Sequence, residues 1–163
     1  MPIDSKEFRN ALGQFATGIC LISRPRKEND DTPTGIVVNS FSSLSLDPPC
    51  VLWCLDKSSS HFDPFIECEA FGVNILAESE QELSDGFANG TIMDFSGIET
   101  ETWESGAELL PTSLVNLECT VIDRIESGDH FIIIGEVSRM RANGSGAPLL
   151  YHAGRYRLLR EEE

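Results

Sequence analysis

Short runs of strand-forming residues, each closed by glycine, proline, asparagine or aspartate, constrain the fold of this chain more than any other feature. The runs cover residues 15–24, 35–41, 50–56 and 71–76, and two more flank a predicted turn at residues 127–129. The segment LLYHAGRYRLL, residues 149–159, predicts one final strand. About six or seven strands without regularly alternating helices favour a mainly β, antiparallel barrel over a doubly wound sheet.

Two stretches have helical spacing. The first begins at Asp4, a predicted N-cap with Glu7 three residues later, and places apolar residues on one face from Phe8 to Phe15. The second begins near Ser79 and ends at Gly90, a typical C-terminal signal. These patterns predict short helices beside the strands.

Two further segments predict irregular structure. Residues 91–112 have weak periodicity, so we expect a long structured loop anchored by Phe95, Ile98 and Trp103. Residues 143–150, NGSGAPLL, predict a turn, because they have only part of a dinucleotide-binding glycine pattern and precede a strand rather than a helix.

Composition limits the domain organisation and the partners. With 163 residues, a mass of 18.0 kDa and 40% hydrophobic residues, the chain is predicted to form one domain over residues 1–163. The net charge of −15, from 27 acidic and 12 basic residues, disfavours nucleic acid and anionic membranes as partners.

The N-terminus and the cysteines indicate the compartment. The first residues, MPIDSKEF, lack a signal region, and no apolar run approaches the roughly 18 residues of a membrane helix, so we expect a cytoplasmic protein. The five cysteines are an odd number and most lie in apolar runs, which favours free thiols over disulfides.

Metal and hydrolase chemistry are poorly supported. Cys50 and Cys54 are four residues apart in a predicted strand, roughly 13 Å at about 3.3 Å per residue, too far to share one tetrahedral ion. The three histidines form no metal-spaced cluster, and no serine has the G-x-S-x-G setting of a nucleophile elbow. We therefore expect no metal site.

Polar residues follow two of the predicted strands. The segment NSFSS, from Asn39, follows GIVV, and DKSSS, from Asp56, follows another apolar run. Amide and hydroxyl groups suit the edge of a heterocycle or a phosphate, and Lys57 could add positive charge, although self-satisfied loops would give the same pattern. These residues are candidates for one binding groove.

Ordered motifs along the chain resemble the flavin reductase-like family of split-barrel flavin-binding proteins. They are ALGQFATGICLIS, GIVVNSFSSLSLDPPCVLWCLDKSSS, AFGVNIL, DGFAN, SGDHFIIIGEV and PLLYHAGRYRLL, spread over residues 8–159. The resemblance implies a six-stranded split barrel, Greek-key in topology, that acts as a homodimer. It also implies hydride transfer from nicotinamide C4 of NADH or NADPH to N5 of FMN or FAD, with the reduced flavin supplied to a partner monooxygenase.

The same resemblance assigns roles to individual residues. His130, in the sequence Gly-Asp-His, matches a position beside the nicotinamide and is the candidate catalytic residue. The residues that match flavin-binding positions are Val38, Asn39, Ser40, Cys54, Ser58, Ser60, Phe87 and Ala88. Val38 stands where the family often has threonine or serine, so one flavin hydrogen bond is expected to be missing or to come from the backbone.

Two other functions remain open at this point. One is a flavin-binding protein or redox partner of the same fold without efficient nicotinamide chemistry. The other is a barrel module that binds a protein or small molecule without flavin.

Overall fold

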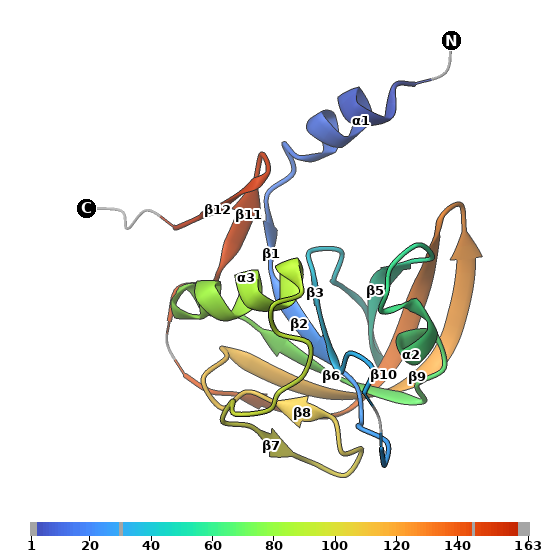
Figure 1. The fold of residues 1–163 in the computed structure, drawn as a ribbon, viewed down its shortest axis with the longest axis vertical. Coiled ribbons are helices and arrows are strands. Elements are labelled where there is room, and N and C mark those ends of the chain that lie inside the picture. Colours follow the sequence, from blue (N-terminus) through green and yellow to red (C-terminus); the bar gives the residue numbers. More distant parts are fainter. Residues whose placement is uncertain (1–2, 30, 145, 160–163) are drawn as a thin grey trace.

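The computed structural model of the protein describes residues 3–29, 31–144 and 146–159. Within these residues the chain forms antiparallel sheets and few short helices (Figure 1), which confirms the predicted mainly β fold class. Residue 145 of the predicted turn, and residues 1–2, 30 and 160–163 of the predicted domain, lie outside the described residues.

The elements follow one another in a strand-rich order. The helices are α1 (Ser5–Leu12), α2 (Phe62–Ile66) and α3 (Gln81–Asn89), with a short 3-10 turn, η1 (Glu78–Glu80), before α3. The strands are β1 (Thr17–Gly18), β2 (Cys20–Ser23), β3 (Gly35–Val38), β4 (Ser42–Leu46), β5 (Pro49–Asp56), β6 (Ala70–Ile75), β7 (Glu101–Thr102), β8 (Glu108–Leu109), β9 (Val115–Ser127), β10 (His130–Ala142), β11 (Leu150–His152) and β12 (Arg155–Arg157).

The largest sheet has the strand order β3-β2-β6-β9-β10-β5-β4. Six of these strands, all except β4, contribute side chains to one buried apolar cluster with Trp53 at its centre. The Trp53 ring makes edge contacts with Phe65 and Phe71, at centroid distances of 5.9 and 6.0 Å. Strands from opposite ends of the sheet order therefore enclose a single core, as expected for a six-stranded barrel.

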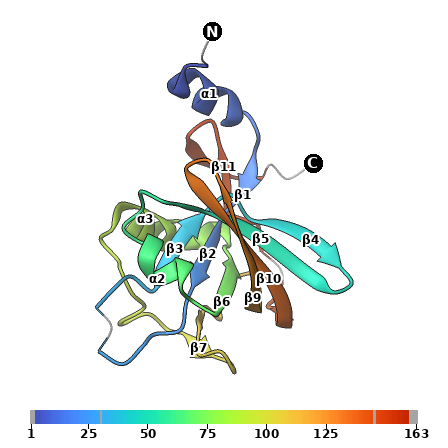
Figure 2. The same cartoon turned by 90° about the vertical axis from the view of Figure 1, so that its right-hand side faces the viewer.

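The seventh strand, β4, was missed by the sequence interpretation, which read its serines as the polar end of the preceding strand. Ser42, Ser43 and Ser45 instead form an edge strand that pairs with β5 and projects from the barrel (Figure 2). The strand is mostly exposed, so its hydroxyls remain solvated and need no buried partners. Pairing with β5, rather than apolar alternation, makes this segment a strand.

The final segment forms a hairpin, so the prediction of one strand over residues 149–159 was wrong. Strands β11 and β12 pair with each other, and Tyr151 lies opposite Tyr156. The turn residues Ala153 and Gly154 have φ angles of 52° and 76°, which reverse the chain in the manner of a tight hairpin turn. Strand β11 also pairs with β1 near the N-terminal helix.

A second apolar cluster lies on the other side of β2 and β3. Leu21 joins this cluster while its neighbours Cys20 and Ile22 face the barrel core, so β2 is buried on both faces. Phe87 of α3 and Phe95 of the following loop pack together here, with ring centroids 5.0 Å apart. The predicted anchoring of the loop by Phe95 is confirmed.

The loop over residues 91–112 contains the short β7–β8 hairpin and is held against β10 by Trp103. The guanidinium of Arg139 lies 4.3 Å from the centroid of the Trp103 ring. Helix α3, which leads into this loop, follows the buried carboxylate of Glu80, which accepts hydrogen bonds from the Thr112 and Ser113 hydroxyls. The segment is therefore structured, as its residues predict.

Helix α1 stands apart from the barrel (Figures 1 and 2). Its predicted N-cap is confirmed, because the Asp4 carboxylate accepts hydrogen bonds from the backbone N–H groups of Lys6 and Glu7. None of its residues is buried, although its apolar face predicts packing. Among the described residues, a backbone hydrogen bond fixes its C-terminal end, where Ala153 N donates to Gly13 O at 2.7 Å.

Candidate functional site

The candidate site lies where β3, β5 and β10 end or begin. Strands β5 and β10 pair antiparallel, with His130 opposite Asp56, so the start of β10 meets the end of β5. Val38 is the last residue of β3, and Asn39 and Ser40 follow it. The strand register therefore brings together polar residues that are about 90 positions apart in the sequence.

A hydrogen bond joins the end of β3 to β5. The backbone N–H of Cys54 donates to the Ser40 hydroxyl oxygen at 3.0 Å. Since β3 and β5 are not paired in the sheet, this contact closes the barrel at the site. The Ser40 hydroxyl therefore has a structural partner already.

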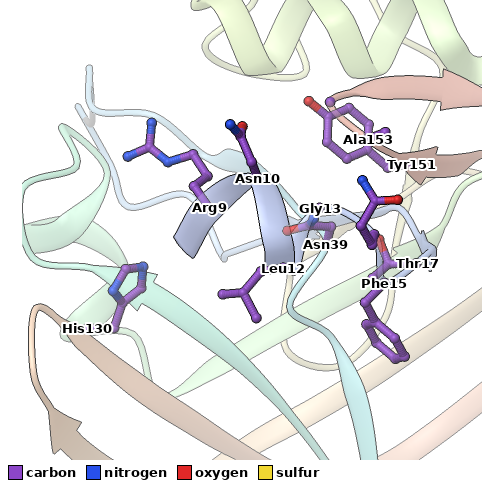
Figure 3. A pocket seen from close by; sticks show the side chains of 12 residues that line it. Arg9, Asn10, Leu12, Gly13, Phe15, Thr17, Asn39, His130, Tyr151 and Ala153 are labelled. Atoms are coloured by element: carbon purple, nitrogen blue, oxygen red, sulfur yellow. The ribbon is translucent and has the colours of Figure 1, made fainter. Parts of the chain in front are cut away.

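Two hollows open at these strand ends. The larger, of about 870 Å³, lies between α1, the β11–β12 turn and the barrel (Figure 3); it is lined by Arg9, Asn10, Leu12, Gly13, Gln14, Phe15, Thr17, Asn39, His130, Tyr151, Ala153 and Gly154. The smaller, of about 210 Å³, is lined by Ile36, Val37, Val38, Asn39, Ser40, Cys54, Asp56, Ser59 and His130. Asn39 and His130 line both, so the two hollows adjoin.

The walls of these hollows contain polar groups without protein partners. The Asn39 side chain makes no hydrogen bond to any described residue, which leaves one acceptor and two donors for a ligand. The buried hydroxyl of Thr17, in the wall of the larger hollow, also has no partner in the part of the chain that the structure describes. Such groups fit a ligand with hydrogen-bonding edges.

His130 is oriented by its neighbour. Its Nδ1 lies 2.7 Å from the Asp129 carboxylate oxygen Oδ1. The hydrogen bond to His130 holds the pKa of Asp129 below its usual value. A carboxylate at Nδ1 favours the tautomer with the proton on that nitrogen, which leaves Nε2 for a ligand.

Asp56 adds negative charge beside the smaller hollow. The backbone N–H and the hydroxyl of Ser58 donate to its Oδ1, each at 2.7 Å. These hydrogen bonds, the backbone one first, lower the pKa of Asp56. The group therefore stays ionised at neutral pH.

Lys57, a candidate hydrogen-bond donor to a phosphate, lines neither hollow. Its Nζ donates to Gly128 O at 2.7 Å and to the Glu126 carboxylate at 2.5 Å. The same ammonium lies 5.5 Å from the centroid of the Phe131 ring. Lys57 thus fastens the end of β5 to the β9–β10 hairpin.

Comparison with known proteins identifies the family. The sequence profile described as "Flavin reductase like domain" matches residues 12–160. The chain belongs to this family. The resemblance seen in the ordered sequence motifs is therefore confirmed over nearly the whole chain.

Individual relatives of this flavin reductase-like protein agree in length and fold. The FMN reductase (NADH) SmoA of Agrobacterium fabrum is 39% identical over 154 residues, which cover 94% of this chain and 85% of that protein. The flavin-dependent monooxygenase reductase subunit HsaB of Mycobacterium tuberculosis is 36% identical over 156 residues, covering 94% and 82%. The Streptomyces globisporus C-1027 NADH:FAD oxidoreductase SgcE6, solved in complex with NAD and FAD fragments, superposes with a TM-score of 0.86 at 29% identity, covering 98% and 97%.

Five of the residues assigned by resemblance lie together in this flavin reductase-like domain. Val38, Asn39, Ser40 and Cys54 line the smaller hollow, and His130 lines both. Val38 is buried, and its side chain packs in the barrel core. Because a valine side chain has no polar atom, only the backbone of Val38 can hydrogen bond to a ligand. The strand ends therefore meet in one groove.

The other four assigned residues line neither hollow. Phe87 is only 2% exposed and packs in the second apolar cluster, while Ala88 is exposed on α3. The Ser58 hydroxyl donates to Asp56, and the Ser60 hydroxyl lies 3.4 Å from His61 Nδ1. Their contact with flavin stays a prediction.

Several lining residues were missed by the sequence interpretation. Ser59, between the two assigned serines, lines the smaller hollow. The larger hollow takes residues from α1 and from the β11–β12 turn, far apart in sequence. No local pattern marks them, because their proximity arises from the pairing of β1 with β11 and from the hydrogen bond that Ala153 N donates to Gly13 O.

Among the described residues, no group of three or more His, Cys, Asp or Glu side chains gathers closely enough to hold a metal ion. No helix in the described ranges has the length and apolar character required to cross a membrane.

Proposed function

We propose that this protein is an NADH-dependent flavin reductase that supplies reduced flavin to a monooxygenase. The observation that carries the proposal is the convergence of Asn39, Cys54 and His130 at two adjoining hollows in a member of the flavin reductase-like family. The printed functions of the relatives, FMN reductase (NADH) and reductase subunit of a flavin-dependent monooxygenase, support it.

The groove residues would bind and align two flat ligands. The bound nicotinamide and flavin supply the redox chemistry, a hydride transfer between their rings. Asn39 would hydrogen bond to the edge of the flavin, with backbone groups of Val38 and Ser40 beside it. His130, held by Asp129, would orient the nicotinamide rather than exchange a proton, and proximity would provide most of the rate enhancement.

One assay tests the proposal. Purified protein is mixed with NADH or NADPH and with free FMN or FAD, and loss of the reduced nicotinamide absorbance is followed. Turnover with at least one of the four pairs is expected. Protein that binds flavin without turnover would be the non-catalytic binder, and protein that neither binds nor reduces flavin would exclude both functions.

Two finer properties belong to this proposal. We expect FMN or FAD to exchange during turnover, because the groove is open and the Ser40 and Ser59 hydroxyls in its smaller hollow already have protein partners. We expect modest NADH affinity, because no dinucleotide-binding fingerprint is present in the sequence. A sub-micromolar dissociation constant for NADH would contradict the second expectation.

The proposed partners are a second copy of the chain and a separate oxygenase component. The unpacked apolar face of α1 supports a homodimer, and the relatives that are reductase subunits support the oxygenase. All five cysteines are free thiols, which fits the proposed location in the reducing cytoplasm.

A further inference from the structure

We propose that Arg9 of helix α1 forms the anion subsite of the larger hollow and binds a phosphate or pyrophosphate group of the nucleotide. The inference rests on the proposed function, because it assigns a part of the same groove. The ligand chemistry is common to the nicotinamide dinucleotide and to the flavin nucleotide, and the experiment below separates these two sources.

The larger hollow differs from the rest of the molecule in charge. About one residue in six of the chain is acidic, 27 of 163, yet none of the twelve residues that line this hollow is Asp or Glu. The hollow instead contains the guanidinium of Arg9 and the imidazole of His130 (Figure 3). In a chain with a net charge of −15, a phosphate would enter where the charge of Arg9 offsets the general repulsion.

Arg9 is also chemically free to bind. Its side chain has no ion pair or hydrogen bond with any described residue. By contrast, Lys57 and Arg141 are paired with Glu126 and Glu101, respectively. A planar guanidinium with five donors is well suited to phosphate oxygens.

The smaller hollow is a poor place for the phosphate group, because carboxylates lie in or beside it. Asp56, whose pKa is lowered by hydrogen bonds from Ser58, lines the smaller hollow, and the Asp129 carboxylate contacts His130. Lys57, which lines neither hollow, is paired with Glu126. A nucleotide with its ring near Asn39 and His130 would therefore extend its phosphates toward α1. A volume of about 870 Å³ lies in the usual range for small-molecule sites.

A structural role for Arg9 is the competing explanation. Arg9 lies in the last turn of α1, where a cation interacts favourably with the helix dipole. This role would change helix stability but not the dependence of ligand affinity on salt or on the phosphate. The test therefore measures how ligand affinity depends on the salt concentration and on the phosphate group.

The experiment compares wild type, Arg9→Gln, Arg9→Lys and the control Lys6→Gln, which removes a charge from an α1 residue that lines neither hollow. The first arm measures KM for NADH with riboflavin, which has no phosphate, as the acceptor, at low and high salt. The second arm measures dissociation constants for FMN and riboflavin by flavin fluorescence. Arg9→Gln should weaken phosphate-dependent binding roughly tenfold at low salt and flatten its salt dependence. Arg9→Lys should retain part of the effect, and Lys6→Gln should resemble wild type.

The two arms identify the source of the phosphate. A higher KM for NADH with an unchanged FMN-to-riboflavin preference assigns Arg9 to the nicotinamide pyrophosphate. Loss of that preference assigns it to the flavin phosphate. If wild type reduces flavin and Arg9→Gln matches it in both arms, the subsite is overturned while the proposed function stands. If wild type reduces no flavin, the proposed function fails, and direct fluorescence titrations of NADH, FMN and riboflavin still decide whether Arg9 binds either phosphate.

Discussion

Asn39 and His130 reach the same groove from separate strands and differ in what holds them. Asn39 has no side-chain partner among the described residues, whereas His130 is bound through Nδ1 to Asp129. A free amide suits recognition of a ligand edge, and a restrained imidazole suits alignment of a reacting ring. We therefore expect the two residues to affect different steps.

Replacing each residue with alanine should separate binding from turnover. Asn39→Ala should raise the flavin dissociation constant roughly threefold to tenfold, because hydrogen bonds worth about 0.5–1.5 kcal/mol are lost. His130→Ala should lower kcat roughly tenfold to hundredfold by misaligning the nicotinamide, with a smaller effect on flavin affinity. Fluorescence titration and steady-state kinetics measure these effects.

His152→Ala is the matched control, because His152 lies on β11 between two lining residues but lines neither hollow itself. It should resemble wild type in both measurements. Unchanged kinetics in His130→Ala would remove His130 from the site.

The reactivity of the cysteine thiols should show whether flavin occupies the groove. Burial raises the pKa of Cys20 and Cys119 to about 12 and that of Cys68 to about 11, and Cys50 is buried too. Cys54 is half-buried at the smaller hollow. In native protein at pH 8, a thiol reagent should modify Cys54 alone, and flavin should slow the reaction.

Cys54→Ser provides the control for this measurement, since it should abolish the native reaction. The unfolded wild type should release all five thiols. Rapid modification of two or more thiols in the native protein would contradict the burial pattern.

Asp56 should make the free energy of unfolding depend on pH. Its pKa is lowered in the folded protein by the Ser58 hydrogen bonds, so its stabilising effect is fully present above the unfolded value, about 3.9. The effect is lost as the pH falls through the lower folded pKa. Wild type should therefore be more stable than Asp56→Asn at pH 7, and the difference should shrink below about pH 4.

Urea unfolding at a series of pH values measures this difference. Asp31→Asn is the control, because Asp31 is exposed and its carboxylate has no hydrogen bond to a described residue. A difference between wild type and Asp56→Asn that grows on acidification would contradict the assignment.

At the scale of elements, the close approach of α3 to β3 depends on Gly35. A Cβ atom at this position would lie 2.5 Å from Cε1 of the buried Phe87 ring. Gly35→Ala should therefore displace α3 and lower the free energy of unfolding by about 1–3 kcal/mol, as overpacking does in other cores.

Gly18→Ala tests whether this effect is specific to packing. Gly18 also lies in a strand, but a Cβ there would meet nothing within 4 Å. This variant should change stability by less than about 0.5 kcal/mol in the same denaturant titration. Equal effects of the two substitutions would show that Phe87 does not limit the position of α3.

The sequence predicted the helix ends and the turn that depend on a few neighbouring residues. The capped start of α1, the αL glycine that ends α3 and the turn of the β9–β10 hairpin all lie where their residues predict. Strand β4 and the β11–β12 hairpin were not predicted, because pairing across the sheet and two positive φ angles decide them. Helix α2 was missed for a similar reason, since it has only five residues and one buried side chain.

The residues of the site also fall into two groups, those that the sequence indicates and those that only the folded chain brings together. Asn39 and Ser40 could be proposed because they directly follow a strong strand signal, and the resemblance to the flavin reductase-like family added Cys54. Arg9 and Tyr151 could not, because their place in the larger hollow depends on the pairing of β1 with β11 and on the direction of α1. For Lys57 the sequence left a phosphate ligand and a surface lysine both open, because sequence alone does not show that Glu126 lies beside it.

At the scale of the whole molecule, helix α1 has an apolar face that no other described segment buries. Phe8, Leu12 and Phe15 are 51%, 57% and 79% exposed, and no α1 residue is buried. An isolated helix of eight residues is marginal in water, so tertiary or subunit packing must supply most of its stability. This supports the proposal that α1 packs against a second copy of the chain.

Sedimentation and light scattering should therefore give a mass of twice 18.0 kDa at micromolar concentration. Phe8→Glu, which places a charge on the apolar face but outside both hollows, should shift the protein toward monomer and lower the helix content. Lys6→Gln, on the same helix, should leave the dimer intact. A monomeric wild type with fully formed α1 would show that the helix needs no partner.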